Sequence, residues 1–439
     1  MQLHGWGRYP RIDSEQLEPA SIEFVQAIIN DKGFRDSVIP RGGGRSYGDS
    51  ALARNVISTR FLDSFLQFNE EHGTIRCGAG VTIEHLLRVA IPKGYFAPVL
   101  PGTRFVTIGG AIAADIHGKN HQRDGSFCDH IERFSLLLAS GEVLECSREE
   151  NVEAFVATCG GMGLTGIVLE ASLKLEKVPS ITIRRESLVS ANLGECIELI
   201  EKHQASKYSV AWLDCQAKGE MLGRSVLHLA EHEECGSQEF RKRWGPTVPF
   251  STPAFLLNKY STKLFNNALY SLRKKTAGVK IVNYDSYFFP LDNIKHWNRV
   301  FGRKGFMQYQ LVVPTDSAKV ALTEILKLVA DSGKGLVVSV LKKFGESNEN
   351  LLSFPSAGYT LTLDFKNEPT VFALLDRLDQ IVLAHGGKLY LAKDARMSEN
   401  VFKNSYNNWE KFVEIKNALD PDCKFASLQS KRIGLTSQV

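Results

Sequence analysis

The spacing of apolar residues along the chain alternates between two periods. Residues 167–175 (IVLEASLKL) alternate apolar and polar side chains and residues 181–189 (ITIRRESLV) have a similar pattern, which predicts two strands. Residues 151–158 (NVEAFVAT) and 317–333 (SAKVALTEILKLVADSG) instead gather their apolar side chains on one helical face, which predicts two helices. Asn151 stands where an N-terminal cap is expected. The pattern indicates a mixed α+β protein.

The segment of residues 57–90 predicts a strand, a hairpin and then a helix. The sequence GAG at residues 78–80 turns into the amphipathic residues 83–90, and Thr82 is the expected cap of that helix. Further along, residues 180–385 alternate strand-like and helix-like segments. We interpret this long alternation as a second domain.

Two glycine-rich stretches, PRGGGRSYGDS at residues 40–50 and PVLPGTRFVTIGGAIAADIHGKNH at residues 98–121, are the most informative local feature. Glycines at this density let backbone N–H groups turn toward one anion without interference from Cβ atoms, which favours a phosphate nest. Neither stretch contains a Walker loop, and neither has the spacing of a Rossmann fingerprint. They predict a pyrophosphate cradle of another type.

A third stretch, residues 159–176, contains a literal G-x-G-x-x-G at Gly161, Gly163 and Gly166. A dinucleotide-binding fingerprint requires a strand before the glycines and a helix after them. Here the expected helix comes first and the expected strand follows. The motif is therefore interpreted as a loop between helix and strand.

Together the three stretches resemble the flavoproteins of the vanillyl-alcohol oxidase and p-cresol methylhydroxylase type. The resemblance extends over GWGR (5–8), DIHGKNH (115–121), AWLD (211–214), FMQYQLVVPT (306–315), LKKFG (341–345) and LYLAKDAR (389–396). It implies a two-domain α+β fold. Residues 1–178, completed by residues 388–439, would form an FAD-binding domain of two α/β subdomains. Residues 179–387 would form a substrate domain, built on an antiparallel sheet with helices.

The resemblance also implies FAD as the cofactor, with its pyrophosphate on residues 40–50 and its isoalloxazine beside the second stretch. Many relatives have a histidine bonded covalently to the flavin where this chain has Arg45. Arginine cannot form that bond, so we expect noncovalent FAD. The expected cofactor contacts are Pro40, Arg41, Gly42, Gly43, Gly44, Arg45, Ser46, Tyr47, Gly48, Asp49, Ser50, Gly102, Thr107, Ile108, Gly109, Gly110, Ala114, Asp115, His117, Ile167 and Tyr390.

Lys393 is the main expected catalytic residue, with His117 and Tyr390 beside it. Oxidation of a secondary alcohol by a flavin moves a hydride to the cofactor and requires the hydroxyl proton to leave. A lysine can act as a neutral base or as a cation that stabilises the anionic reduced flavin, and the sequence leaves both roles open. His117 and His121 imitate a metal pair, but Gly118 and the surrounding loop disfavour the helix that this spacing needs. We expect no metal, and a structural role for His121.

The expected substrate contacts lie on segments that resemble the family's substrate pocket: Lys119, Trp212, Arg299, Gln308, Gln310, Lys342 and Thr362. Lysine, arginine and glutamine suit a phosphodiester and sugar hydroxyls. Three positions depart from the pattern, since Thr362, Thr360 and Phe288 stand where cysteine, asparagine and tyrosine are expected. These departures leave the identity of the sugar or lipid open.

Within the family, these motifs imply FAD-dependent oxidation of a sugar secondary hydroxyl. The expected substrate is the 2'-hydroxyl of a polyprenyl-phosphoryl-β-D-ribofuranose, oxidised to a ketone during ribose-to-arabinose epimerisation for cell-envelope glycans. The expected partner is a short-chain NADH-dependent reductase. Two alternatives remain: a soluble alditol or aldonolactone oxidase that uses oxygen, and a catalytically silent flavin-binding partner.

Charge is distributed unevenly. The whole chain has a formal net charge of +4, yet residues 240–284 contain no Asp or Glu. Nine basic residues and several aromatic ones lie in that stretch, which leaves the rest of the chain acidic. A basic, aromatic stretch favours an anionic bilayer surface over nucleic acid, because no nucleic-acid-binding module accompanies it. A solvated loop followed by one packed helix is the simpler alternative.

The eight cysteines form no C-x-x-C pair, and no signal peptide follows Met1. No run of about 18 apolar residues occurs, as a spanning helix would need. We therefore expect a cytoplasmic protein with reduced thiols, bound peripherally at the inner face of the membrane.

Overall fold

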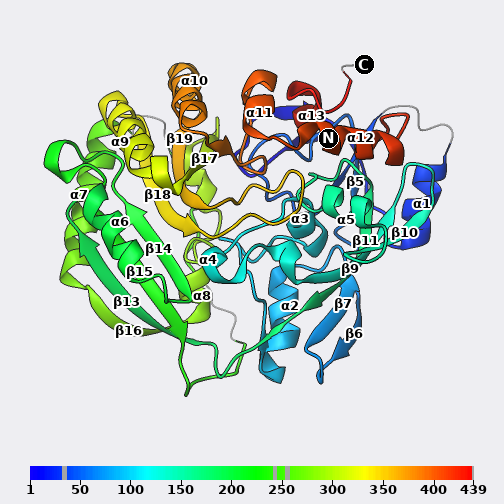
Figure 1. Cartoon of the computed structure of the whole chain (residues 1–439), viewed down its shortest axis with the longest axis horizontal. Coiled ribbons are helices and arrows are strands. Elements are labelled where there is room, and N and C mark those ends of the chain that lie inside the picture. Colours follow the sequence, from blue (N-terminus) through cyan, green and yellow to red (C-terminus); the bar gives the residue numbers. More distant parts are fainter. Residues whose placement is uncertain (32–36, 241–244, 253–257, 438–439) are drawn as a thin grey trace.

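The computed structural model describes residues 1–31, 37–240, 245–252 and 258–437. In Figure 1 a large sheet with its helices lies beside a group of smaller sheets, and the C-terminal helices pack on the smaller sheets. Among the described residues, no helix combines the length and the apolar character needed to cross a bilayer.

The N-terminal part contains two principal sheets. The parallel sheet has the order β3 (Glu15–Leu17), β5 (Asn55–Ser58), β4 (Val38–Arg41). The antiparallel sheet has the order β10 (Val143–Ser147), β9 (Ile131–Leu137), β11 (Ile167–Lys174), β7 (Thr74–Gly78), β6 (Phe65–Asn69). Two small pairs join β1 (Gln2–His4) to β2 (Arg11–Asp13) and β8 (Tyr95–Phe96) to β12 (Glu176–Lys177).

The helices of this part are α1 (Ile22–Asn30), α2 (Ile83–Ala90), α3 (Ile108–Ala113), α4 (His121–Asp124) and α5 (Val152–Thr158). The prediction for residues 57–90 is confirmed, including the cap, since the Thr82 hydroxyl accepts from the His85 backbone N–H. The helix, loop and strand order around the third glycine stretch is also confirmed by α5 and β11. Asn151 occupies the cap position of α5, but its amide donates to the Glu145 carbonyl instead of capping the helix.

In the part of the chain that the structure describes, the large sheet has eight strands, and all of its neighbouring strands are antiparallel. Their order is β16 (Gly278–Asn283), β13 (Thr182–Ser190), β15 (Ser225–His232), β14 (Tyr208–Leu213), β18 (Gly335–Phe344), β19 (Gly358–Lys366), β17 (Phe306–Pro314), β20 (Lys388–Leu389). This sheet, the smaller sheets and the helices packed on them confirm the predicted α+β fold class.

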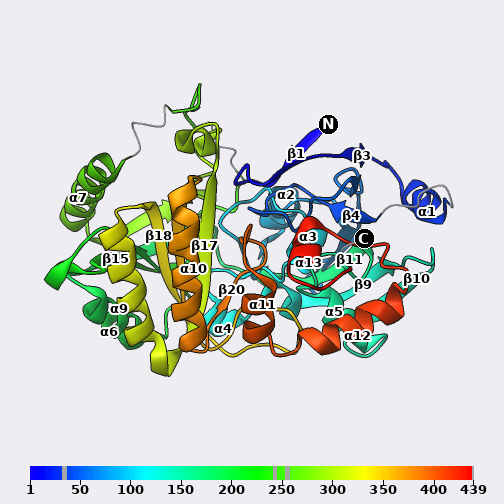
Figure 2. The ribbon, with the colours of Figure 1, turned by 90° about the horizontal axis from the view of Figure 1, so that it is seen from above.

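Helices cover both faces of the large sheet, as Figure 2 shows. α6 (Leu193–Lys202), α9 (Thr315–Ser332) and α10 (Pro369–Ala384) cover one face, whereas α7 (Lys259–Lys275) lies on the other. A short helix, α8 (Tyr284–Phe288), follows β16. The predicted strand at 181–189 and helix at 317–333 correspond to β13 and α9.

After β20 the chain returns to the smaller sheets through α11 (Glu399–Ser405), α12 (Trp409–Leu419) and α13 (Leu428–Arg432). Val38 of β4 exchanges backbone hydrogen bonds with Lys424 and Ala426. Since β20 pairs with β17 of the large sheet, the chain leaves that sheet only after Leu389. The domain limits at 178 and 388 stay predictions.

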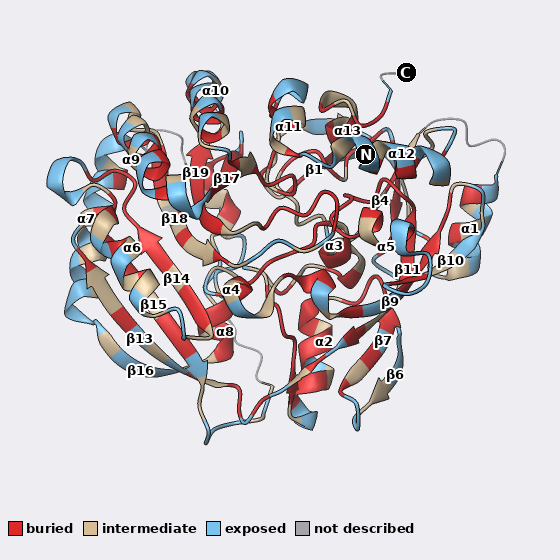
Figure 3. Cartoon of the chain, in the orientation of Figure 1, coloured by how far each residue is buried: buried red, intermediate tan, exposed pale blue. Residues whose placement is uncertain are grey.

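Burial is greatest in the middle strands of the large sheet and in the contact between the two parts (Figure 3). Strands β17 and β19 are buried over nearly their full length. They nevertheless contain glutamine, threonine and aspartate. We name the buried polar residues the polar row: Gln308, Gln310, Thr360, Thr362 and Asp364. Because a buried polar group costs free energy unless it is hydrogen-bonded, the presence of these residues in the core requires an explanation.

Candidate active site

The polar row occupies one face of the paired strands β17 and β19. Gln308 lies opposite Asp364 and Gln310 lies opposite Thr362, and alternate residues of a strand point to the same face. Thr360 joins them, because its hydroxyl accepts from the Gln310 amide at 3.2 Å. Three expected substrate residues are therefore neighbours on one buried surface.

Lys393 lies beside this surface, shortly after β20. Its Nζ is 4.0 Å from the centre of the Tyr47 ring, a cation–π contact between the C-terminal segment and the first glycine loop. Burial lowers the pKa of Lys393 to about 8, and the charge of Asp364 opposes that shift. A lysine amine with this pKa exchanges its proton near neutral pH, as a catalytic base requires.

Asp364 is the residue that sequence reasoning missed. It is fully buried; one carboxylate oxygen accepts from the Gln308 amide at 2.7 Å, and the other has no partner among the described residues. Burial raises the pKa of Asp364 to about 7, while the Gln308 hydrogen bond and Lys393 oppose the rise. The sequence did contain a signal for this residue, because an aspartate at an inward-facing position of a buried strand indicates a functional or paired carboxylate.

His117 lies at the same surface, next to Gln310. The Gln310 amide lies 3.0 Å from His117 Nε2, so the ring accepts there and carries its proton on Nδ1, which has no partner among the described residues. Burial and the nearby cations Lys342 and Lys393 hold the pKa of His117 well below its usual range. His117 is therefore a neutral group with one unsatisfied nitrogen at the site. His121 differs, since its Nδ1 accepts from the Gly345 N–H at 3.2 Å.

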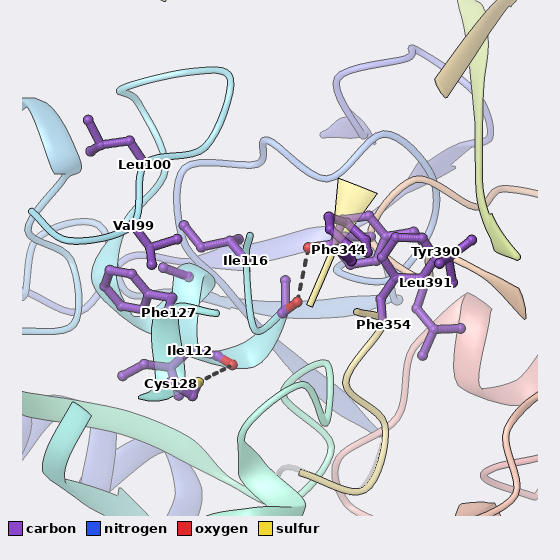
Figure 4. Close-up of a cluster of buried hydrophobic side chains, with 14 of the residues drawn as sticks. Val99, Leu100, Ile112, Ile116, Phe127, Cys128, Phe344, Phe354, Tyr390 and Leu391 are labelled. Carbon is purple, nitrogen blue, oxygen red and sulfur yellow. Dashed lines mark hydrogen bonds between the residues drawn. The ribbon is translucent and has the colours of Figure 1, made fainter. Parts of the chain in front are cut away.

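Tyr390 contributes a ring rather than a free hydroxyl. Its hydroxyl donates to the Ala114 carbonyl at 3.0 Å, and its ring stacks on Phe354 with centroids 4.6 Å apart. Figure 4 shows Tyr390, Phe354 and Phe344 gathered together beside the His117 segment. These aromatic rings exclude water from one side of the site.

The first glycine loop has unused donors. The backbone N–H groups of residues 43–46 have no acceptor among the described residues. A run of unpaired amides is the donor set that a diphosphate satisfies, so the loop fits the pyrophosphate of FAD. At Gly42 a Cβ would overlap the Thr107 side chain, which explains why only glycine lets the loop approach the second stretch.

Arg45 lies at the edge of that loop between two aromatic rings. Its guanidinium carbon is 4.6 Å from the Trp6 ring centre and 5.0 Å from that of Phe105, and its Nε has no partner among the described residues. The Arg41 guanidinium lies against Gly44 of the loop, where a Cβ would overlap it, and donates to the carbonyls of His4 and Ala51. Neither side chain offers a group for covalent attachment of a flavin.

The same loop holds the Lys393 segment in place. The Tyr47 N–H donates to the Ala392 carbonyl at 2.9 Å, and a Cβ on Gly48 would overlap the Asp394 backbone. Asp49 is paired with Arg432, which also binds Asp394. The carboxylate of Asp49 is therefore occupied by protein groups. Pro40 lies within β4, one residue before its end, and Ser50 is buried.

In the second stretch, several predicted cofactor residues already have protein partners. The N–H groups of Ile108, Gly109 and Gly110 donate to Val81, Ala79 and Thr107. Any cofactor contact of these three residues must therefore come from other atoms than their amides.

Asp115 has an unusual backbone, with φ of 36°, and a fully buried side chain. Its carboxylate accepts from Ser126, Cys128, Asn348, Asn350 and Ser353. It ties the 115–128 segment to the 348–353 segment. Gly102 is exposed and Ile167 is buried at the start of β11.

The remaining expected substrate residues divide into two groups. Lys119 and Lys342 lie near His117, and Lys342 donates to the Gly118 carbonyl at 3.4 Å. Trp212 lies on β14 opposite Val340 of β18, and its indole donates to the Val337 carbonyl at 3.0 Å. Phe288 packs in an aromatic cluster with Phe96 and Tyr208.

Arg299 lies apart from that group. It lines an open cavity of about 500 Å³ together with Arg45 and Arg303, and its side chain donates to the carbonyls of Val248 and Pro249. It does not line the small cavity beside Lys393, Gln308 and Gln310.

Comparison with known proteins gives the family. A family model described as an FAD binding domain matches residues 16–147. Decaprenylphosphoryl-beta-D-ribose oxidase of Mycolicibacterium smegmatis is 34% identical, over 99% of this chain and 97% of its own length. Mouse L-gulonolactone oxidase is 22% identical over 99% of this chain and 98% of its own length. D-2-hydroxyglutarate dehydrogenase of Stutzerimonas stutzeri is 29% identical over 37% of each chain.

Proposed function

Because the chain belongs to the FAD-linked oxidoreductases of the vanillyl-alcohol oxidase and p-cresol methylhydroxylase type, we propose that it oxidises a sugar secondary hydroxyl with noncovalent FAD. The proposed substrate is the 2'-hydroxyl of a polyprenyl-phosphoryl-β-D-ribofuranose, and the product is the 2'-ketone. The observation that supports this most directly is the buried Lys393 amine, 4.0 Å from the Tyr47 ring centre in the first glycine loop and beside the polar row. The full-length similarity to a ribose oxidase supports the choice of sugar.

Bound FAD would supply the hydride acceptor. The residues of this chain handle the proton and the orientation of the sugar. Lys393 takes the hydroxyl proton at Nζ or holds a positive charge there. Asp364 stabilises that charge, Gln308 keeps Asp364 in place, and Gln310 with His117 provides hydrogen-bonding groups for a second hydroxyl.

The ketone would then be reduced by a short-chain NADH-dependent reductase to complete a ribose-to-arabinose epimerisation for cell-envelope glycans. The sugar of a lipid-linked substrate lies at the bilayer surface, so an enzyme that acts on it without spanning the membrane must bind at that surface. The exposed apolar residues Leu264, Phe265 and Leu272 of α7, among exposed lysines, support such a contact.

The test is anaerobic bleaching of the bound flavin. We expect rapid loss of flavin absorbance with farnesyl-phosphoryl-β-D-ribofuranose, and little with L-gulono-1,4-lactone or D-2-hydroxyglutarate. The second candidate is an aldonolactone oxidase, favoured by the full-length similarity to L-gulonolactone oxidase. Bleaching by the lactone alone would establish that candidate instead, and no bleaching by any of the three would contradict both.

The noncovalent state has a separate test. Because Arg45 cannot bond to the flavin, we expect denaturation in acid to release all yellow colour into the soluble fraction. Flavin fluorescence that migrates with the polypeptide on a denaturing gel would contradict this.

A further inference from the structure

Five basic side chains from five different segments form a continuous group on the face of the large sheet that carries the polar row. We name them the cationic row: Lys119, Lys342, Arg185, His228 and Arg273. Only the two lysines were predicted from sequence as substrate contacts, and Arg273 was predicted as part of the basic stretch at 240–284. The other three come from β13, β15 and α7.

The strand register places the sheet members on one face. His228 lies opposite Ser187, and its Nδ1 is 2.9 Å from the Ser187 hydroxyl, so both point to the same side. Arg185 precedes Ser187 by two residues and shares that side. Lys342 lies opposite Thr360, whose hydroxyl binds Gln310 of the polar row. The cationic row therefore continues the face that carries the polar row.

The other two members reach this face from outside the sheet. Lys119 follows the His117 segment; its Nζ donates to the Tyr287 carbonyl and is 4.1 Å from the Tyr287 ring centre. Arg273, near the end of α7, lies with its guanidinium carbon 4.9 Å from the Trp212 ring centre. Arg273 thus turns toward the sheet, unlike its exposed neighbours Lys274 and Lys275.

Among the described residues, no carboxylate forms an ion pair with any member of the row. Arg185 Nε, Arg273 Nη1 and the Tyr287 hydroxyl are enclosed and have no hydrogen-bond partner there. The members also disfavour one another's charges: burial and neighbouring cations lower the pKa of Lys119 and Lys342 to about 7 and that of Arg273 to about 10. Burial and three of these cations lower the pKa of His228 to about 3.

Gathering like charges away from water is costly unless an anion joins them. Unpaired guanidinium and phenol donors in a half-buried site are the donors that bind a phosphate group. We propose that the cationic row is the subsite for the phosphoryl group of the sugar substrate, read mainly by Arg185 and Arg273. This proposal rests on the proposed function and adds the residues that distinguish a phosphorylated sugar from a free one.

The position of the row agrees with the shape of such a substrate. Its inner end, Lys342, is close enough to Lys393 for the two charges to interact, so the sugar and the phosphate can be bound together. Its outer end, Arg273, lies beside Leu272 on α7, whose side chain is 59% exposed. The row thus runs from Lys393 to a helix with exposed apolar side chains, where a polyprenyl chain can leave.

The test compares Arg185→Gln with Arg184→Gln. Arg184 is adjacent on β13 but exposed, and it points to the other side of the sheet, where its Nε is 3.8 Å from a carboxylate oxygen of Glu233. Two sugars are used in anaerobic flavin reduction: farnesyl-phosphoryl-β-D-ribofuranose and methyl β-D-ribofuranoside, which lacks phosphate. Arg185→Gln should raise the half-saturating concentration of the phosphoryl sugar about 10- to 100-fold, the usual loss for one hydrogen bond to a charged group. The limiting rate of flavin reduction in the Arg185→Gln variant should not change, nor should the concentration dependence of its reduction by the methyl riboside. The Arg184→Gln variant should behave as wild type.

Arg273→Gln, on a different element, should reproduce the effect if the Arg185 variant does not fold. The competing location is the arginine-lined cavity beside Arg299. The proposal would be overturned if Arg303→Gln raised the half-saturating concentration of the phosphoryl sugar while Arg185→Gln and Arg273→Gln left it unchanged. Even if neither sugar reduces the flavin, the anion-binding role of the cationic row can be tested with inorganic pyrophosphate, whose binding is measured through the change it causes in the flavin spectrum. Binding that is weakened by Arg185→Gln would then support the subsite while the proposed function failed, and binding unaffected by it would reject the subsite.

Discussion

At the scale of single residues, the site depends on a buried lysine and a buried aspartate whose ionisation is linked. Lys393 and Asp364 each oppose the effect of burial on the other, so the pKa of the amine is about 8 and that of the carboxyl about 7. Both groups can change protonation near neutral pH. A pair of this kind can take up the hydroxyl proton without leaving an isolated buried charge.

Replacing Lys393 with methionine should remove the proton-handling group and keep the packing. We expect the variant to bind FAD normally, because the unused amides of residues 43–46 are unchanged, and to reduce its flavin at least about 100-fold more slowly with substrate. Stopped-flow absorbance of the yellow variant measures this. Near wild-type reduction would exclude the role.

Replacing Asp364 with asparagine should shift the pH dependence of flavin reduction. The carboxylate stabilises the Lys393 cation, so its removal lowers the pKa of Lys393 below about 8 and moves the corresponding limb of the rate profile to lower pH. A limb that rises with pH identifies Lys393 as a neutral base, and one that falls identifies it as a cation. In both cases the shift is downward, and an upward shift would contradict the coupling.

At the scale of elements, α13 fastens the first glycine loop to the Lys393 segment. Arg432 of α13 pairs with Asp49 of the loop at 2.7 Å and with Asp394 at 2.8 Å. Both carboxylates are buried, so the positive charge of Arg432 offsets the free-energy cost of removing their negative charges from water. The C-terminal segment thereby positions Lys393 against the first glycine loop.

Arg432→Met should therefore leave two buried carboxylates unpaired and lower the free energy of unfolding by about 3 kcal/mol, with loss of FAD on gel filtration. Urea denaturation of the purified protein measures the change. Lys403→Met is the matched control, because its pair with Glu399 on α11 lies at the surface and is worth about 0.3–0.5 kcal/mol. Equal effects of the two changes would refute the role of Arg432.

At the scale of the whole molecule, α7 presents exposed apolar and basic residues on the same helix. Phe265 and Leu272 are exposed, and so are Lys263, Lys274 and Lys275. Arg241, Lys242 and Arg243 of the predicted basic stretch lie outside the described residues. The arrangement suits a bilayer surface with anionic lipids.

We expect the protein to sediment with anionic vesicles at low salt and to be released as salt rises, because exposed charges are screened within about 10 Å at 0.1 M. Changing Lys263, Lys274 and Lys275 to glutamate should weaken this binding and slow turnover of the lipid-linked sugar in vesicles, with the short-chain analogue unaffected. Arg273 is kept, since it faces the sheet. Unchanged sedimentation of the triple variant would contradict membrane contact through α7.

The local pattern determined the elements. The helix–loop–strand order around Gly161, the cap at Thr82 and the strand and helix at 182–190 and 315–332 follow from residues close together in sequence. Glycine density likewise predicted an anion-binding loop at residues 40–50, and the unused amides of residues 43–46 fit that prediction. Steric freedom and short-range periodicity need no knowledge of distant segments.

Only the tertiary structure decided which polar residues meet. Asp364, Arg185 and His228 occupy ordinary inward positions of strands, and their importance comes from strand register and from α7 and residues 115–121 packing over them. The structure likewise assigned Asp49 and Asp115 to protein partners and turned Arg273 away from solvent. Charge pairing and desolvation depend on distances between segments far apart in the chain, which no local pattern of residues encodes.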